Sequence, residues 1–218
     1  GVSAGGADLA LMGYPLSRPR RMRQSEGLRR LLRETHLSAD SLVMPLFVRG
    51  GKNIRAAIPS MPGHFQFSVD QLVKECRELT QAGVPGVLLF GLPSEKKDER
   101  GSGAWARDGI IQQAASAIKG AAPDLTIITD VCLCGYTSHG HCGIVKYARG
   151  SRLRAQGRAK HKRRPTAQSP QPTAERDFWI DNDATLELLG RVAASHAQAG
   201  ADMVAPSGML DGFVGACR

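Results

Sequence analysis

Long apolar runs are missing from this sequence, and so is any recognisable targeting segment. No stretch approaches the roughly 18 apolar residues that a membrane-spanning helix needs, and the longest, Leu42–Val48 and Val84–Phe90, have the length of strands. The N-terminus has no charged region followed by an apolar one, so we expect no secretory signal. It also has no initiating methionine, which suggests that the sequence begins inside a longer reading frame. Aromatic residues make up only 5%, but 42% hydrophobic residues in 218 suffice for one globular domain with a sizeable core.

Excess positive charge is absent from most of the chain. The formal net charge is +9, but residues 146–176 alone hold ten Lys and Arg against one acid, Glu175. The rest of the chain is balanced, so the sequence describes a neutral domain that carries one basic insert. Nucleic acid is therefore an unlikely partner for the domain as a whole.

Cysteines are few, and their arrangement argues against a disulfide framework. Three of the five lie within eleven residues, at Cys132, Cys134 and Cys142. The odd total, the C-x-C spacing and the lack of a signal favour metal ligation in a reducing compartment, which predicts a cytoplasmic protein.

Strand-like and helix-like segments alternate along the chain. The apolar periodicity predicts four strands, at Leu42–Val48, Val84–Phe90, Leu125–Asp130 and Ala201–Pro206. It also predicts a helix at Glu26–Glu34 that Ser25 caps, a helix over Ala106–Gly120 and a helix that begins at Asn182. A further helix is predicted to begin after Ser68, which forms a capping box with Gln71, and to end at Gly83. Strands that are apolar on both faces, alternating with helices, indicate an α/β fold with a parallel sheet covered by helices. Four such units fit half of an eight-stranded barrel or a small open sheet, and periodicity does not distinguish the two.

The cysteine cluster directly follows the third predicted strand, where barrel enzymes carry their chemistry. Cys132 and Cys134 are two residues apart, so an extended backbone points both thiols the same way, and Gly135, Gly140 and Gly143 allow the loop to return Cys142 beside them. Three thiolates with one open position suit a catalytic zinc ion. Two other interpretations stay open: a closed structural site completed by His139 or His141, or buried thiols without metal. His141 is alternatively a residue beside the metal, hydrogen-bonded to a ligand or substrate.

The run Thr129–Ile144, with its Asp-Val-Cys-Leu-Cys and Ser-His-Gly-His-Cys-Gly segments, resembles the zinc-type signature of porphobilinogen synthases (5-aminolevulinate dehydratases). Further segments resemble that family in the family's order: Arg18–Arg21, Met44–Val48, Leu89–Pro93, Lys97–Ser102, Asp181–Leu186 and Ala199–Ser207. The resemblance covers about residues 14–146 and 180–215.

The resemblance implies a lyase of haem and tetrapyrrole biosynthesis that condenses two 5-aminolevulinate molecules into porphobilinogen on a (β/α)8 TIM barrel. It implies zinc on Cys132, Cys134 and Cys142, and a catalytic carboxylate at Asp130 for hydrogen bonding or proton transfer. Ser207 matches the start of a family loop after the fourth strand, which makes it a second catalytic candidate. The family usually forms a homo-octamer in which an N-terminal arm wraps a neighbour.

Two departures from the family pattern follow. The resemblance places the two Schiff-base lysines of the family beyond the segments that match. None of the lysines of this chain stands in the matching context, so we expect the chain by itself to be inactive. These lysines are Lys52, Lys74, Lys96, Lys97, Lys119, Lys146, Lys160 and Lys162. The predicted organisation is an arm (1–24), the first part of a barrel with the zinc loop (25–146), a basic low-complexity insertion (147–179) and a fourth strand unit (180–218). The insertion is predicted to be disordered, and two interpretations of it stay open: a functional basic tether, or a non-coding stretch or frame error that has been translated.

Two other functions compete with the enzyme. The half-barrel could be a non-catalytic zinc-binding module that captures subunits through its arm. A nucleic-acid binder would use residues 149–164, but the insertion has aromatic residues only at its borders, at Tyr147, Phe178 and Trp179.

Overall fold

The computed structural model describes residues 18, 20–93, 97–147 and 178–218. The chain divides into two compact units, residues 1–38 and 39–218. Most of the predicted arm and most of the predicted insertion lie outside the described residues. Within the described ranges, no helix is long and apolar enough to cross a membrane.

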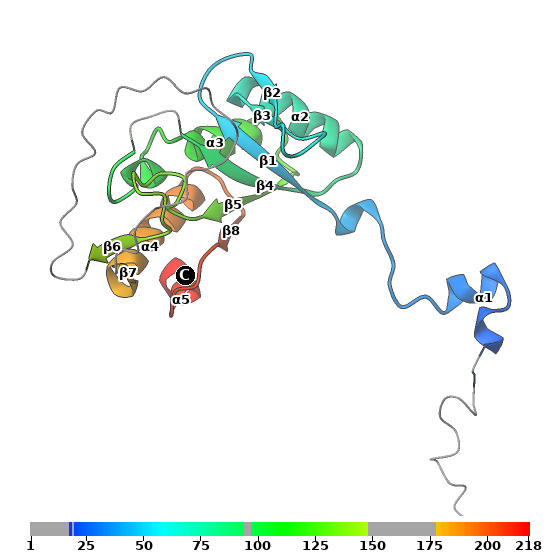
Figure 1. Cartoon of the computed structure of the whole chain (residues 1–218). Coiled ribbons are helices and arrows are strands. Elements are labelled where there is room, and N and C mark those ends of the chain that lie inside the picture. The colour runs from blue at the N-terminus through cyan, green and yellow to red at the C-terminus, as the bar shows by residue number, and fades with distance from the viewer. Residues whose placement is uncertain (1–17, 19, 94–96, 148–177) are drawn as a thin grey trace, which may run out of the picture. The chain divides into compact units, whose positions relative to one another are not determined.

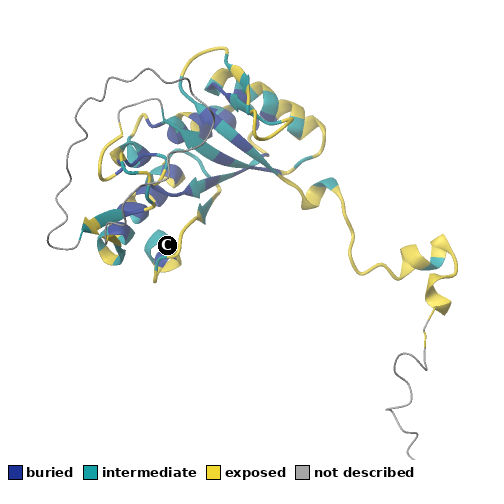
Figure 2. Ribbon diagram, viewed as in Figure 1, coloured by how far each residue is buried: buried dark blue, intermediate teal, exposed yellow. Residues whose placement is uncertain are grey.

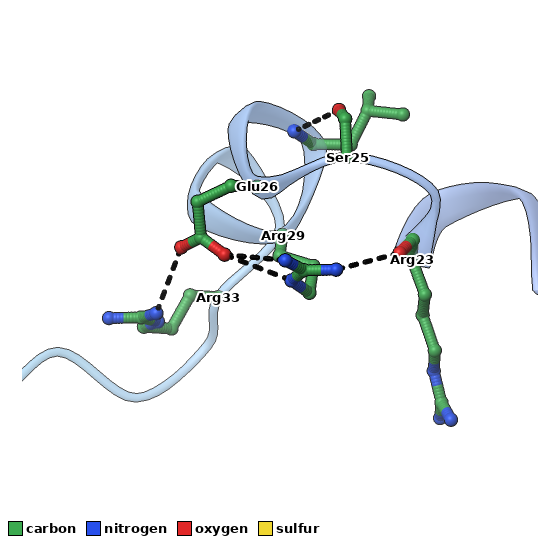
Figure 3. A network of polar contacts seen from close by, with 6 residues as sticks. Arg23, Ser25, Glu26, Arg29 and Arg33 are labelled. Carbon is green, nitrogen blue, oxygen red and sulfur yellow. Dashed lines mark hydrogen bonds and ion pairs between the residues drawn. The ribbon is translucent and has the colours of Figure 1, made fainter.

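The described part of the first unit is a 3-10 turn, η2 (Arg21–Arg23), followed by the short helix α1 (Glu26–Leu31). Ser25 caps the helix as predicted, because its Oγ accepts a hydrogen bond of 3.2 Å from the Leu28 N–H. Figure 3 shows Glu26 and Arg29 paired through Oε2, at 2.7 Å from Nη2. The helix ends three residues before the predicted Glu34, since none of its residues is buried and exposed ion pairs add at most about 1 kcal/mol each.

A six-stranded sheet forms the centre of the second unit (Figure 1), in the order β2-β3-β1-β4-β5-β8. The strands are β1 (Val43–Arg49), β2 (Arg55–Ala57), β3 (Phe65–Phe67), β4 (Gly86–Leu92), β5 (Thr126–Val131) and β8 (Met203–Pro206). All neighbours from β3 to β8 pair in parallel, and only β2 pairs antiparallel. The four predicted strands are confirmed as β1, β4, β5 and β8, and within the described residues the sheet has two edges instead of closing into a barrel.

Pro45 is an unusual residue inside a strand because it lacks a backbone N–H, and the register explains why it is tolerated. On one side Pro45 lies opposite Leu88 of β4. On the other side β3 pairs with β1 only from Phe47 onward. Pro45 therefore stands where β1 has no neighbour on that side, so its missing N–H leaves no gap in a ladder.

Three helices cover one face of the sheet: α2 (Val69–Gln81), α3 (Ile110–Ala121) and α4 (Asn182–Gln198). Alternate strand residues are buried beneath them, for example Leu46 and Val48 in β1 and Ile127 and Val131 in β5. Figure 2 shows this dark core between sheet and helices. The opposite face is only half-buried, and there Phe47 and Phe90 stack with centroids 5.3 Å apart. Within the described residues, helices therefore cover the parallel sheet on one face.

One predicted helix cap and one predicted helix start need correction. Ser68 does not form the capping box with Gln71, because its Oγ accepts from the Ile54 N–H at 2.8 Å and donates to the Asp70 carboxylate at 2.6 Å. Gly83 does follow α2, at φ +80°. Helix α3 begins at Ile110 rather than Ala106, because the 3-10 turn η4 (Ser102–Trp105) occupies the residues before it. A further 3-10 turn, η3 (Ala39–Ser41), precedes β1, and the short helix α5 (Phe213–Cys217) follows β8.

A two-stranded hairpin that was not predicted from the sequence lies next to the cysteine loop. Strands β6 (Ile144–Tyr147) and β7 (Phe178–Asp181) pair antiparallel, with Tyr147 opposite Phe178 and Ile144 opposite Asp181. The predicted insertion 147–179 therefore includes three strand residues, Tyr147, Phe178 and Trp179. Helix α4 begins directly after β7 at the predicted Asn182, and Asp181 caps it by accepting from the Ala184 N–H at 3.2 Å.

Candidate metal centre

The cysteine loop leaves the sheet at the carboxyl end of β5, between β4 and β8. Its first half is anchored by apolar side chains, because Leu133 is fully buried and Tyr136 nearly so. Backbone N–H groups of Tyr136 and Thr137 both donate to the Leu133 carbonyl, at 2.8 and 2.9 Å, which turns the chain back on itself. Cys132 and Cys134 stand directly before and after Leu133 in the chain, so their side chains lie together on the side opposite to the buried Leu133 side chain.

The three cysteine sulfurs are close enough to share one ion. Sγ of Cys132 and Sγ of Cys134 are 3.3 Å apart, and the sulfurs of Cys132, Cys134 and Cys142 all lie within 4.8 Å of one another. Two sulfurs bound tetrahedrally to one zinc ion at 2.3 Å lie about 3.8 Å apart, which falls inside this range. In the part of the chain that the structure describes, these cysteines make up the group of titratable side chains that could hold a metal ion, and no histidine belongs to it.

Burial affects the protonation of the thiols. Desolvation raises the pKa of Cys132 and that of Cys142, and it outweighs the contacts among the cysteines, some of which raise and some of which lower these pKa values. Without a cation these two thiols therefore keep their protons at neutral pH. Metal binding must release those protons, so the affinity of the cluster rises with pH.

The two histidines of the loop make other contacts. His139 accepts from the His141 N–H at Nδ1 (3.2 Å) and lies 3.1 Å from the Glu99 carbonyl through Nε2, so both of its ring nitrogens are engaged. The His141 ring contacts the Phe178 ring, with centroids 4.5 Å apart, and stacks on His139 at 5.4 Å. This geometry does not support a closed site completed by either histidine, and the role predicted for His141 beside the metal stays a prediction.

Asp130 and Ser207 lie at the same edge of the sheet as the cysteines. Asp130 is the last but one residue of β5, and Ser207 directly follows β8 and donates its N–H to the Val131 carbonyl at 3.1 Å. Burial raises the pKa of the half-buried Asp130 carboxyl, while a hydrogen bond from the Ser207 side chain acts in the opposite direction. The charge of Asp130 also contributes to the raised pKa of Cys142, which indicates that carboxyl and thiol are neighbours. The structure thus brings the predicted residues together, while their catalytic roles stay predictions.

Three polar residues that hold the loop were not identified from the sequence. Thr137 donates from Oγ1 to the His141 carbonyl at 2.9 Å, and Thr185 of α4 accepts from the Ile144 N–H at 2.9 Å. The loop after β4 contributes Asp98, whose backbone forms a β-bridge to Thr137 and whose backbone carbonyl accepts from the Ser138 N–H at 2.8 Å. A buried threonine has no periodic signal in a sequence, because its partner is a backbone group distant along the chain.

Fold and site together define a class: an α/β protein with a mostly parallel sheet and, at the carboxyl end of β5, a cluster of three cysteines that could hold a metal ion. Comparison with known proteins makes the class specific. The family model of delta-aminolevulinic acid dehydratase matches residues 16–158 and 168–218. The chain belongs to the delta-aminolevulinic acid dehydratase family.

Individual relatives agree with this family assignment. The chain is 44% identical over 205 residues to the delta-aminolevulinic acid dehydratase of Synechocystis, which covers 94% of this chain and 54% of that protein. It is 44% identical over 203 residues to the one of Ruminiclostridium josui, covering 93% and 84%. A crystal structure of the Toxoplasma gondii enzyme, porphobilinogen synthase in complex with its reaction product porphobilinogen, superposes with a TM-score of 0.75 at 34% identity and covers 93% of this chain and 49% of that one. The chain thus spans about half the length of most of the curated relatives it matches.

Proposed function

We propose that this chain supplies the metal-binding half of an active site that condenses two molecules of 5-aminolevulinate into porphobilinogen. The observation that carries the proposal is the gathering of three cysteine sulfurs within 4.8 Å at the end of β5, beside Asp130 and Ser207, in a chain of this family. The product complex of the Toxoplasma gondii relative supports the substrate class.

The donor set fits zinc. Three thiolates in a trigonal arrangement leave a fourth position for a substrate or water, as in catalytic rather than structural zinc sites. Zinc bound there would polarise a substrate carbonyl as a Lewis acid. Cys134 and Cys142 are exposed, which supports a site that a small molecule can reach.

Asp130 is the candidate proton-transfer residue of this half. Its burial favours the protonated carboxyl, so the proton can be held at the Asp130 Oδ atoms closer to neutral pH than in an ordinary aspartate. The Ser207 hydroxyl, which donates toward the carboxylate, orients it. Together the two side chains can bind and direct a polar substrate group beside the sulfurs.

We also propose that the 218 residues alone do not turn over substrate. A Schiff-base lysine must attack as a neutral amine. Lys119 is ion-paired with Asp202 at 2.6 Å, and Lys146 is ion-paired with Asp181, so carboxylates already engage both amines. The lysines that react with substrate in this family would then come from later barrel segments, such as those of the longer relatives.

A chimera tests the proposed activity. The barrel segments that follow the matched region of the Synechocystis relative are fused after Arg218, and porphobilinogen is measured by colour assay together with zinc content. We expect the chimera to form porphobilinogen, the same chimera with Cys132→Ser to lose both zinc and product, and the 218-residue chain to bind zinc without forming product. A folded, zinc-loaded chimera without activity would refute the proposed function.

The same proposal includes the oligomeric state of the protein and its location in the cell. We infer a homo-oligomer, as the family resemblance implies, and a cytoplasmic location. All five cysteines are free, which suits a reducing compartment. Sedimentation of the purified chimera tests the first inference, and localisation of the tagged chain tests the second.

A further inference from the structure

The three candidate ligands are not held equally well. Cys132 follows β5 directly and is 7% exposed, and Cys134 is adjacent to the fully buried Leu133. Cys142 is exposed and lies eight residues further on, after a loop with Gly140 at φ +76°. Apolar packing of its own side chain therefore does not place Cys142, and the backbone around it must.

Two buried threonines hold that backbone, one just before Cys142 and the other just after it in the chain. Thr137 is 1% exposed, and its hydroxyl donates to the His141 carbonyl at 2.9 Å, just before Cys142. Thr185 is fully buried, and its hydroxyl accepts from the Ile144 N–H at 2.9 Å, two residues after Cys142. The span 141–144 is thereby fixed at both ends, with the cysteine between them.

Thr185 is itself fixed in one orientation. Its hydroxyl donates to the Asp181 carbonyl one turn earlier at 2.6 Å, so its lone pair is directed to Ile144. Thr185 of α4 and Ile180 of β7 also pack against the backbone at Gly143, where an added Cβ would lie 2.5 Å from Thr185 Oγ1 and 2.7 Å from Ile180 Cγ2. Helix α4 and the span 141–144 therefore meet without space for adjustment.

From these contacts we infer that Thr137 and Thr185 are positioning residues, which keep Cys142 within reach of the sulfurs of Cys132 and Cys134 and so set the metal affinity of the cluster. This inference rests on the proposed metal site, and it adds the two residues that pre-organise it. Groups that orient metal ligands typically change metal affinity by ten- to a hundredfold when removed.

The test replaces each hydroxyl by a methyl group of nearly equal volume, as Thr137→Val and Thr185→Val. Zinc affinity is measured by competition with a chromophoric chelator, and the cobalt(II)-loaded proteins are compared by their sulfur-to-metal charge-transfer absorption. We expect about tenfold weaker zinc binding for each variant, weaker absorption per cobalt, and recovery of both in Thr185→Ser, which keeps the hydroxyl.

Thr129→Val is the matched control. Thr129 is fully buried and its hydroxyl contacts His196 Nδ1 at 3.0 Å, on the helix side of β5 and away from the cysteine loop. It should lower the free energy of unfolding like the other variants but leave zinc affinity unchanged.

The outcomes distinguish a failure of the proposed function from a failure of the inference about Thr137 and Thr185. Wild-type chain that binds no zinc contradicts the proposed function. Wild-type chain that binds zinc, with folded Thr137→Val and Thr185→Val binding it equally well, overturns this inference alone. Should one valine variant fail to fold by circular dichroism, the other and Thr185→Ser still decide the question, because each hydroxyl acts on a different end of the span.

Discussion

Replacing residues 148–177 by Asn-Gly should stabilise the protein. Tyr147 and Phe178 are directly opposite each other in the hairpin, so a two-residue turn can join them without moving either strand. From loop length alone, joining the two strands through 30 residues costs more loop-closure entropy than joining them through two, by about 2 kcal/mol. The shortened protein should therefore have a free energy of unfolding higher by about 2 kcal/mol.

Urea unfolding followed by circular dichroism measures this change. For a typical dependence on denaturant, about 2 kcal/mol moves the midpoint upward by roughly 1 M. Zinc affinity should stay the same, because β6 and β7 keep their register and Phe178 keeps its contact with His141. A lower midpoint, or a marked loss of zinc affinity, would show that residues 148–177 make native contacts and would refute the reasoning.

Two further predictions concern single residues. Gly143→Ala should lower the free energy of unfolding by about 1–3 kcal/mol in chemical unfolding, because the new Cβ would overlap Thr185 and Ile180. Gly120→Ala is the control, because the space around its Cβ is open and the substitution should not destabilise the fold. Equal effects of the two substitutions would contradict the close packing at Gly143. Burial lowers the pKa of His196 from 6.5 to about 4, so below pH 6.5 the unfolded chain binds the proton and the folded chain does not. Stability should therefore fall by up to about 3 kcal/mol as pH is lowered from 6.5 to 4, and His196→Leu should flatten this part of the profile; an unchanged slope in that variant would assign the pH dependence to other groups.

The longest elements could be predicted because their signal is local. Strands β1, β4 and β5 carry apolar runs, and α4 begins where Asp181 supplies a cap. The three-residue strands β2 and β3 could not be predicted, since each exists only through pairing with a neighbour. The hairpin was missed for the same reason, because its strands pair across 30 residues.

The candidate metal site also has a part that the sequence predicts and a part that it does not. The C-x-C spacing after a strand predicts the proximity of Cys132 and Cys134, and the structure confirms it. The return of Cys142 was attributed to three glycines, but only Gly140 has a positive φ, and Gly143 serves instead to let α4 approach. What holds Cys142 depends on Thr137 and Thr185, whose partners are backbone groups that only the folded chain brings near.

X-ray absorption at the zinc edge of the metal-loaded chain tests most directly whether Cys132, Cys134 and Cys142 share one ion. The arrangement of their sulfurs predicts one zinc per chain with three sulfur neighbours at about 2.3 Å and one lighter atom. A first shell dominated by nitrogen and oxygen, or zinc that stays bound with the same spectrum in Cys142→Ser, would contradict it.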